Sequence, residues 1–268
     1  MKPKEIKVGL SGTIPIASFE NLKPYFEISA EIEVGDNVDE KMKELRKIIK
    51  QHFEQEGNNA KAELIEKQYS NIRFYEKDGK KYPSVTSILN WNVDFRIPED
   101  ELQQYGARGT IVHRLVEEYL DVGKWVEPTV IPELNNEIAT VTAGSLGLHW
   151  KDCSYIKAME TLKDDLKVQE LEVELFNDEH LYAGRSDLLC QYKGKTTIID
   201  FKTGTTADMR QLAAYAVCEK GVEQMMIVPV GPTDNKSGMK KPIISTDVQG
   251  EFKKFVYARQ AFRERFGI

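Results

Sequence analysis

The stretch Tyr182–Tyr215 constrains the fold more than any other part of the chain. Residues 184–192 mix apolar and polar side chains, as in a strand near a sheet edge, and Lys193-Gly194 supplies a turn. Residues 196–202 are rich in β-branched and aromatic side chains, which favours a second strand. The pattern predicts a hairpin whose second strand is largely buried.

This hairpin is expected to gather two carboxylates and a lysine. Asp200 and Lys202 share a face because strand side chains alternate, and the hairpin brings Asp187 alongside them. Two close carboxylates repel each other unless a cation lies between them. Mg²⁺ takes one or two carboxylates, keeps several waters and leaves room for phosphate oxygens. Lys202 would orient an attacking water or stabilise charge on phosphorus. The alternative is a surface hairpin with weak ion pairs, but apolar Ile198-Ile199 and Phe201 favour the metal site.

The motifs in this stretch resemble those of the PD-(D/E)xK nuclease superfamily, in its RecB-like exonuclease branch. They are G-x-x-D at Gly184–Asp187, I-D-F-K-T at Ile199–Thr203 and Q-x-x-x-Y at Gln211–Tyr215, with an upstream histidine, His113. The segment Tyr82–Leu89 is similar to the opening of the nuclease core in the mitochondrial genome-maintenance exonuclease. The resemblance covers about residues 83–230.

The resemblance implies an α/β fold. We expect a restriction-endonuclease-like core with a mixed central sheet flanked by helices over residues 79–268. A small α+β module of unknown role would precede it over residues 1–78. The implied activity is metal-dependent hydrolysis of phosphodiester bonds in DNA.

The implied metal is Mg²⁺ or Mn²⁺. Its expected ligands are Asp187, Asp200, the carbonyl of Phe201, and His113, whose imidazole suits Mn²⁺ better than Mg²⁺. In the other interpretation, His113 and Glu117 form a surface pair one helical turn apart. The glycines at 106 and 109 permit close backbone approach just before the histidine.

Further site residues are expected on either side of the hairpin. Relatives often carry an active-site glutamate on the preceding strand, and Glu172 is the best candidate, although Glu174 shares its predicted face. A solvated strand face explains both glutamates equally well. Relatives also use the Q-x-x-x-Y pair, here Gln211 and Tyr215, to contact nucleic acid and support the lysine. The loop at 203–206, beginning with Thr203, is able to present hydroxyls and amides to phosphate.

Composition limits the function classes. The 268 residues are 41% hydrophobic and 30% charged, which is typical of a soluble globular protein, and no apolar run has the length of a membrane span. We expect a location in the cytoplasm, or in the host cytoplasm if the chain is viral. Only three cysteines are present, so no iron–sulfur cluster is expected. The net charge of −6 argues against a nucleic-acid partner, but it can hide a local basic groove.

Outside the motifs, periodicity predicts two N-terminal strands, at residues 8–16 and 28–34. A helix capped by Asn37 is expected to break at residues 56–59, with a short helix over 60–70, and helices are expected at 98–120, 152–166 and 208–220. A basic loop at 234–241 and a cationic C-terminal helix could line a channel for a nucleic-acid strand. Core packing explains the aromatic residues of that helix equally well.

The sequence therefore predicts a DNA exonuclease for single-stranded or end-exposed DNA. Replication, recombination or repair is the expected setting, with protein partners or oligomers possible. Two alternatives stay open: an endonuclease with the same chemistry, and a catalytically silent scaffold in a DNA-processing assembly.

Overall fold

The computed structural model describes residues 5–17, 20–93, 97–205 and 207–268. The chain divides into two units, one formed by the chain up to Trp91 together with Gln260–Ile268, the other by Asn92–Arg259. The sequence places a domain boundary between residues 78 and 79, and that boundary remains a prediction.

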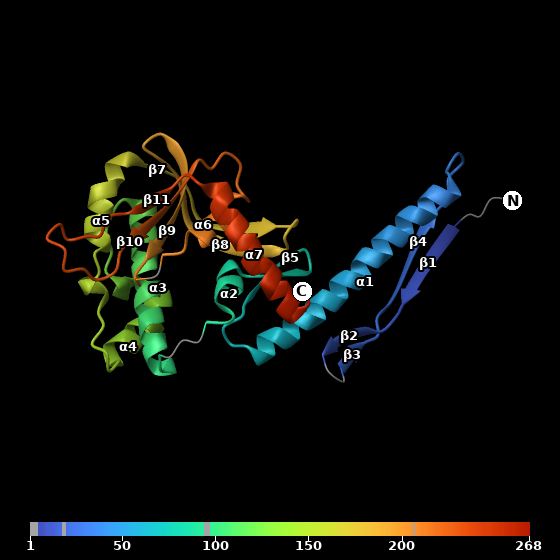
Figure 1. The fold of residues 1–268 in the computed structure, drawn as a ribbon, viewed down its shortest axis with the longest axis horizontal. Helices are drawn as coiled ribbons and strands as arrows, with labels where there is room; N and C mark the ends of the chain where they lie inside the picture. The colour runs from blue at the N-terminus through green and yellow to red at the C-terminus, as the bar shows by residue number, and fades with distance from the viewer. Residues whose placement is uncertain (1–4, 18–19, 94–96, 206) are drawn as a thin grey trace. The chain divides into compact units, whose positions relative to one another are not determined.

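The second unit is built on a five-stranded mixed sheet in the order β11-β10-β9-β8-β7 (Figure 1). Strands β9 and β10 are parallel, and the other neighbours are antiparallel. This confirms the predicted mixed sheet flanked by helices. The strands are β7 (Leu166–Asn177), β8 (Tyr182–Tyr192), β9 (Lys195–Lys202), β10 (Gln224–Pro229) and β11 (Ile243–Ser245).

Helices cover both faces of this sheet. Ile199 and Phe201 of β9 share a core with Ile111 and Met159, so α3 and α5 lie on that face. Asp200 alternates with these residues and meets α6 on the opposite face. The helices of this unit are α3 (Glu99–Val122), α4 (Asn135–Ala143), α5 (Tyr155–Leu162), α6 (Met209–Ala216) and most of α7 (Val248–Phe266), with short 3-10 turns at Pro128–Val130, Pro132–Leu134, Trp150–Asp152 and Lys163–Asp165.

The predicted hairpin is the β8–β9 pair. Lys193 and Gly194 have φ of 50° and 80°, and Tyr192 pairs with Lys195 across the turn. Two consecutive positive φ values are typical of the type I′ turn, whose twist matches that of the strands it joins. A local turn signal therefore fixes the register that sets Asp187 near the end of β9.

The first unit packs a long helix, α1 (Val38–Gln68), against two antiparallel strands, β1 (Glu5–Ser11) and β4 (Tyr25–Glu31) (Figure 1). Asn37 caps α1 as predicted, since its side chain accepts hydrogen bonds from the amides of residues 39 and 40. Four short strands replace the two predicted ones. The remaining elements are β2 (Ile14–Ala17), β3 (Glu20–Leu22), β5 (Phe74–Lys77), β6 (Lys80–Pro83) and α2 (Val85–Asn90).

The helix break predicted at residues 56–59 is wrong, because α1 continues to Gln68 without interruption. Gly57 is buried, and a Cβ there would lie 2.9 Å from Ile14 Cγ2. The glycine thus permits close approach of β2 to the helix, and this packing compensates for its poor helix propensity.

Candidate active site

Asp187 lies where strands β8 and β9 stop pairing. Their last paired residues in this direction are Leu188 and Ile199, and beyond them Asp187 Oδ2 accepts a hydrogen bond of 2.6 Å from the amide of Phe201. The Asp187 carboxylate therefore accepts a hydrogen bond that a backbone carbonyl would accept if the two strands were still paired. The amide and carbonyl of one strand residue point to the same side, so the Phe201 carbonyl also faces the Asp187 side.

Asp200 and Lys202 form an ion pair on the α6 face of β9. Lys202 Nζ lies 2.8 Å from Asp200 Oδ2, and the aspartate is 3% exposed. Gln211 of α6 bridges the pair: its Nε2 donates to Asp200 Oδ1 at 3.0 Å, and its Oε1 accepts from Lys202 Nζ at 3.1 Å. One amide thus fixes both charged groups.

Tyr215 supports Gln211 from the next turn of α6. Its hydroxyl oxygen accepts a hydrogen bond of 3.2 Å from Gln211 Nε2, and its ring lies over Gly184 with no space for a Cβ. Gln211 and Tyr215 are 8% and 3% exposed. Both side chains therefore position the Asp200–Lys202 pair, while their contact with nucleic acid remains a prediction.

Gly184→Ala is expected to lower the free energy of unfolding by about 1–3 kcal/mol, because the added methyl group overlaps the Tyr215 ring. A displaced Tyr215 also releases Gln211, so the hydrolysis of phosphodiester bonds that the sequence predicts should become slower. Urea unfolding and a nuclease assay measure the two effects. The matched control is Gly106→Ala, at an exposed helical position with no atom within 4 Å of the new Cβ. If both variants behave alike, the contact between Tyr215 and Gly184 has no such role.

His113 reaches the site from α3. Its Nδ1 lies 3.4 Å from Asp187 Oδ2, whereas Glu117 pairs with Arg114 at 2.6 Å. The alternative pairing of His113 with Glu117 is therefore not the one observed.

Gly109, on the same helix as His113, packs against Thr203, since a Cβ at residue 109 would lie 3.3 Å from Thr203 Oγ1. The loop that begins at Thr203 borders the site, but Thr206 lies outside the described residues.

The pKa values of these groups reflect crowded charge. Burial acts to lower the pKa of His113, but the Asp187 carboxylate outweighs it and raises the pKa to about 8. Burial, reinforced by the charge of Asp187, raises the pKa of Asp200 to about 6. Burial would also raise the pKa of Asp187, but His113, the Phe201 amide and Lys202 hold it below its ordinary value. The neighbouring protein groups therefore stabilise the negative charge of Asp187 but do not fully compensate that of Asp200.

Glu172 lies on β7 across from Asp187. The neighbouring pairs Leu171–Leu188 and Val173–Ser186 bracket the two acids, and Glu172 has a positive φ of 50°. Burial raises the pKa of Glu172, Arg185 opposes this, and Asp187 adds to it. Glu174, the other candidate, is exposed and lies opposite Arg185 in the register.

Arg185 is a site neighbour that sequence reasoning missed. Its Nε lies 2.8 Å from Glu172 Oε2. The signal was its place two residues before Asp187 on the same strand, a spacing that puts two side chains on one face.

The candidate ligand atoms suit Mg²⁺ or Mn²⁺, which also bind water and substrate oxygens. They suit less well a metal ion that is held by side chains alone. In the described part of the chain, no three His, Cys, Asp or Glu side chains are arranged as a ready metal site. Asp200 Oδ2 is nevertheless buried without a hydrogen bond of good geometry, despite its ion pair with Lys202. Two carboxylates and a carbonyl, completed by water and substrate oxygens, are what Mg²⁺ accepts.

Comparison with known families decides the assignment. The sequence profile of the PD-(D/E)XK nuclease superfamily matches residues 89–227, just over half of the chain. The chain belongs to the PD-(D/E)XK nuclease superfamily. No curated protein sequence matches it significantly.

Members of this superfamily are typically metal-dependent nucleases, so the family supports hydrolase chemistry on a nucleic acid. They generally use divalent ions such as Mg²⁺ or Mn²⁺, in agreement with the candidate ligand atoms. Among the described residues, no helix is long and apolar enough to cross a membrane.

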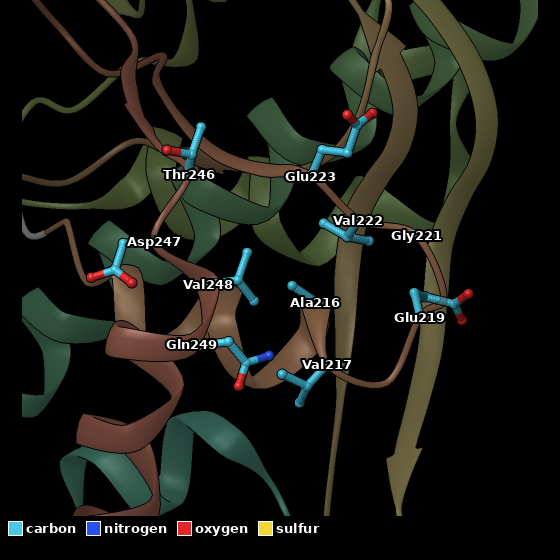
Figure 2. A pocket seen from close by; sticks show the side chains of 10 residues that line it. All are labelled: Ala216, Val217, Glu219, Gly221, Val222, Glu223, Thr246, Asp247, Val248 and Gln249. Carbon is cyan, nitrogen blue, oxygen red and sulfur yellow. The ribbon is translucent and has the colours of Figure 1, made fainter.

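A cavity of about 460 Å³ lies at the other end of the parallel strands, at the start of β10 and of α7 (Figure 2). Its carboxylates include Glu223, which accepts a hydrogen bond from the Thr196 amide, and Asp247, which accepts one from the Gly250 amide. These acids hold the ends of secondary-structure elements. None of the predicted site residues lines this cavity.

Proposed function

We propose that the protein is a metal-dependent DNA exonuclease of the RecB-like branch, acting on single-stranded or end-exposed DNA in replication, recombination or repair. The observation that supports it best is the group of Asp187, Asp200 and Lys202 at the end of β9. Gln211 holds Asp200 and Lys202, and the Phe201 amide holds Asp187. Such an arrangement of buried, fixed charge is unnecessary for a silent scaffold.

Asp187, Asp200 and the Phe201 carbonyl would hold the metal ion, with His113 as a further ligand. When bound, the ion polarises the phosphate and lowers the pKa of an attacking water. Lys202 stands beside Asp200, where its ammonium group orients that water and stabilises the charge that develops on phosphorus. Glu172, across from Asp187, is the candidate to accept a proton.

Gln211 keeps Lys202 and Asp200 in place through its two hydrogen bonds, and Tyr215 keeps Gln211 oriented. Thr203 and the loop after it would present hydroxyls and amides to the phosphate. The exonuclease mode is supported by the combination of G-x-x-D, D-F-K-T, Q-x-x-x-Y and an upstream histidine, since that set resembles the RecB-like exonucleases.

A linear single strand is expected to be degraded progressively with Mg²⁺ or Mn²⁺, while a covalently closed circular single strand of the same sequence resists. The reason is that an exonuclease needs a free end to enter the site. Product sizing on gels measures both. Rates should also fall as salt rises, because cations that bind phosphate compete with the protein. Rapid cutting of the circle would instead establish the endonuclease, and no cutting of either substrate would favour the scaffold.

A further inference from the structure

A second cavity, lined by lysines, adjoins Lys202 on the side away from Asp187. It has a volume of about 190 Å³ and is lined by residues from three segments. Gly204 and Thr205 come from the loop after β9, Pro229 ends β10, and Lys240 and Lys241 precede β11. Since β10 and β11 follow β9 in the sheet and β8 lies on its other side, the cavity and Asp187 flank Lys202.

The charge of this cavity is positive in a protein whose net charge is −6. Three lysines line it and no carboxylate does. Lys202 is paired with Asp200. Lys240 and Lys241 have no ion-pair partner among the residues that the structure describes, so their charges are available to an external anion.

The two lysines lie on an anchored segment. At its start, the amide of Val230 donates to the Lys202 carbonyl at 2.8 Å, and the Val230 carbonyl accepts from the Ser154 amide at 2.9 Å. Next to the lysines, Met239 is 8% exposed and packs in the core. The Met239 carbonyl accepts hydrogen bonds from Asn235 Nδ2 at 3.2 Å and Ser237 Oγ at 2.8 Å.

The other end of the segment is also fixed, because Ile243 begins β11 and pairs with Ile227 of β10. The position of the backbone beside Lys202 is thus set by the fold. Both lysines lie beyond residue 227, where the family match ends. Family membership therefore says nothing about them.

We infer that Lys240 and Lys241 form a subsite for a phosphate that neighbours the scissile phosphate on the same nucleic-acid strand. This inference rests on the proposed function. A strand that passes Asp187 and Lys202 at the end of β9 would next meet this cavity. Lysine provides a compact charge for a phosphate oxygen, and such contacts fix the register of the strand without reading its sequence.

The test compares Lys240→Gln/Lys241→Gln with Lys236→Gln, a control at an exposed lysine of the same segment that does not line the cavity. Binding of a single-stranded oligonucleotide is measured in EDTA over a range of salt concentrations. The double variant should bind roughly tenfold more weakly. The slope of log K against log salt should become shallower by about 0.7, as expected for one phosphate contact. The control should match the wild type in both.

Hydrolysis with metal provides a second readout. The double variant should show a raised KM with kcat nearly unchanged, because the contact is made equally in the ground and transition states. A set of oligonucleotides, each with one neutral methylphosphonate linkage, then locates the phosphate. One linkage should weaken wild-type binding about as much as the double substitution does, and should have no further effect on the double variant.

The two proposals fail in different ways. If the wild type hydrolyses DNA and the double variant equals it in affinity, salt slope and KM, the subsite is overturned. If neither protein hydrolyses DNA but the double variant alone ignores one methylphosphonate position, the proposed hydrolysis is wrong and the phosphate subsite is supported.

Discussion

Asp200→Asn is expected to leave a folded protein that hydrolyses DNA about 1,000-fold more slowly than the wild type. The substitution keeps the shape of the side chain but removes a negative ligand, and metal polarisation contributes several kcal/mol, here roughly 4, to the transition state. The asparagine oxygen can still accept the hydrogen bond from Gln211 Nε2 that Asp200 Oδ1 accepts now. Single-turnover hydrolysis at saturating Mg²⁺ measures the loss.

Stability supplies an independent readout for this variant. Burial and the charge of Asp187 raise the pKa of Asp200, so its ionised form is disfavoured in the folded protein without metal. The Tm of Asp200→Asn without metal should therefore equal or exceed that of the wild type, while stabilisation by Mn²⁺ is lost. Asp121→Asn, at an exposed position of α3, should keep both activity and the Mn²⁺ effect. Retention of the Mn²⁺ effect by Asp200→Asn would remove Asp200 from the metal site.

Lys202→Ala is expected to reduce kcat about 100- to 1,000-fold, the cost of losing one group that stabilises developing charge. Affinity for DNA should change little, because the ammonium group is held by Asp200 and Gln211 before substrate binds and acts mainly in the transition state. Lys195→Ala, at the exposed first residue of the same strand, is the matched control. Affinity lost in proportion to kcat would make Lys202 a phosphate anchor instead.

Much of the geometry of the candidate site was predictable because its signals are local. The Lys193-Gly194 turn fixes the β8–β9 register, and that register sets Asp187 close to the Phe201 amide. The spacing of Asp200 and Lys202 puts them on one strand face whatever surrounds the sheet. The cap of α1 was predictable for the same reason, as Asn37 accepts hydrogen bonds from the amides two and three residues further along the chain.

The remaining features depend on contacts between distant segments. The residues at 56–59 predicted a helix break, but Gly57 is kept inside α1 by its contact with Ile14, more than 40 residues away in the sequence. The pairing of Gly184 with Tyr215 is likewise visible only once α6 lies on β8.

Strand alternation also failed at β7. It treats Glu172 and Glu174 as equivalent, but the positive φ of Glu172 interrupts the regular alternation between them. Glu172 is partly buried opposite Asp187, whereas Glu174 is exposed. A positive φ at one residue depends on how the strand packs against its neighbour, which a period of two cannot encode.

The most direct test of the account is metal-dependent hydrolysis of an end-labelled single-stranded DNA by the wild type and by Asp200→Asn, each with Mg²⁺, with Mn²⁺ and with EDTA. We expect the wild type to shorten the DNA with either ion and to be inactive in EDTA, and Asp200→Asn to be nearly inactive throughout. Hydrolysis by the wild type in EDTA, or equal hydrolysis by both proteins with Mg²⁺, would contradict a metal-dependent site at Asp187, Asp200 and Lys202.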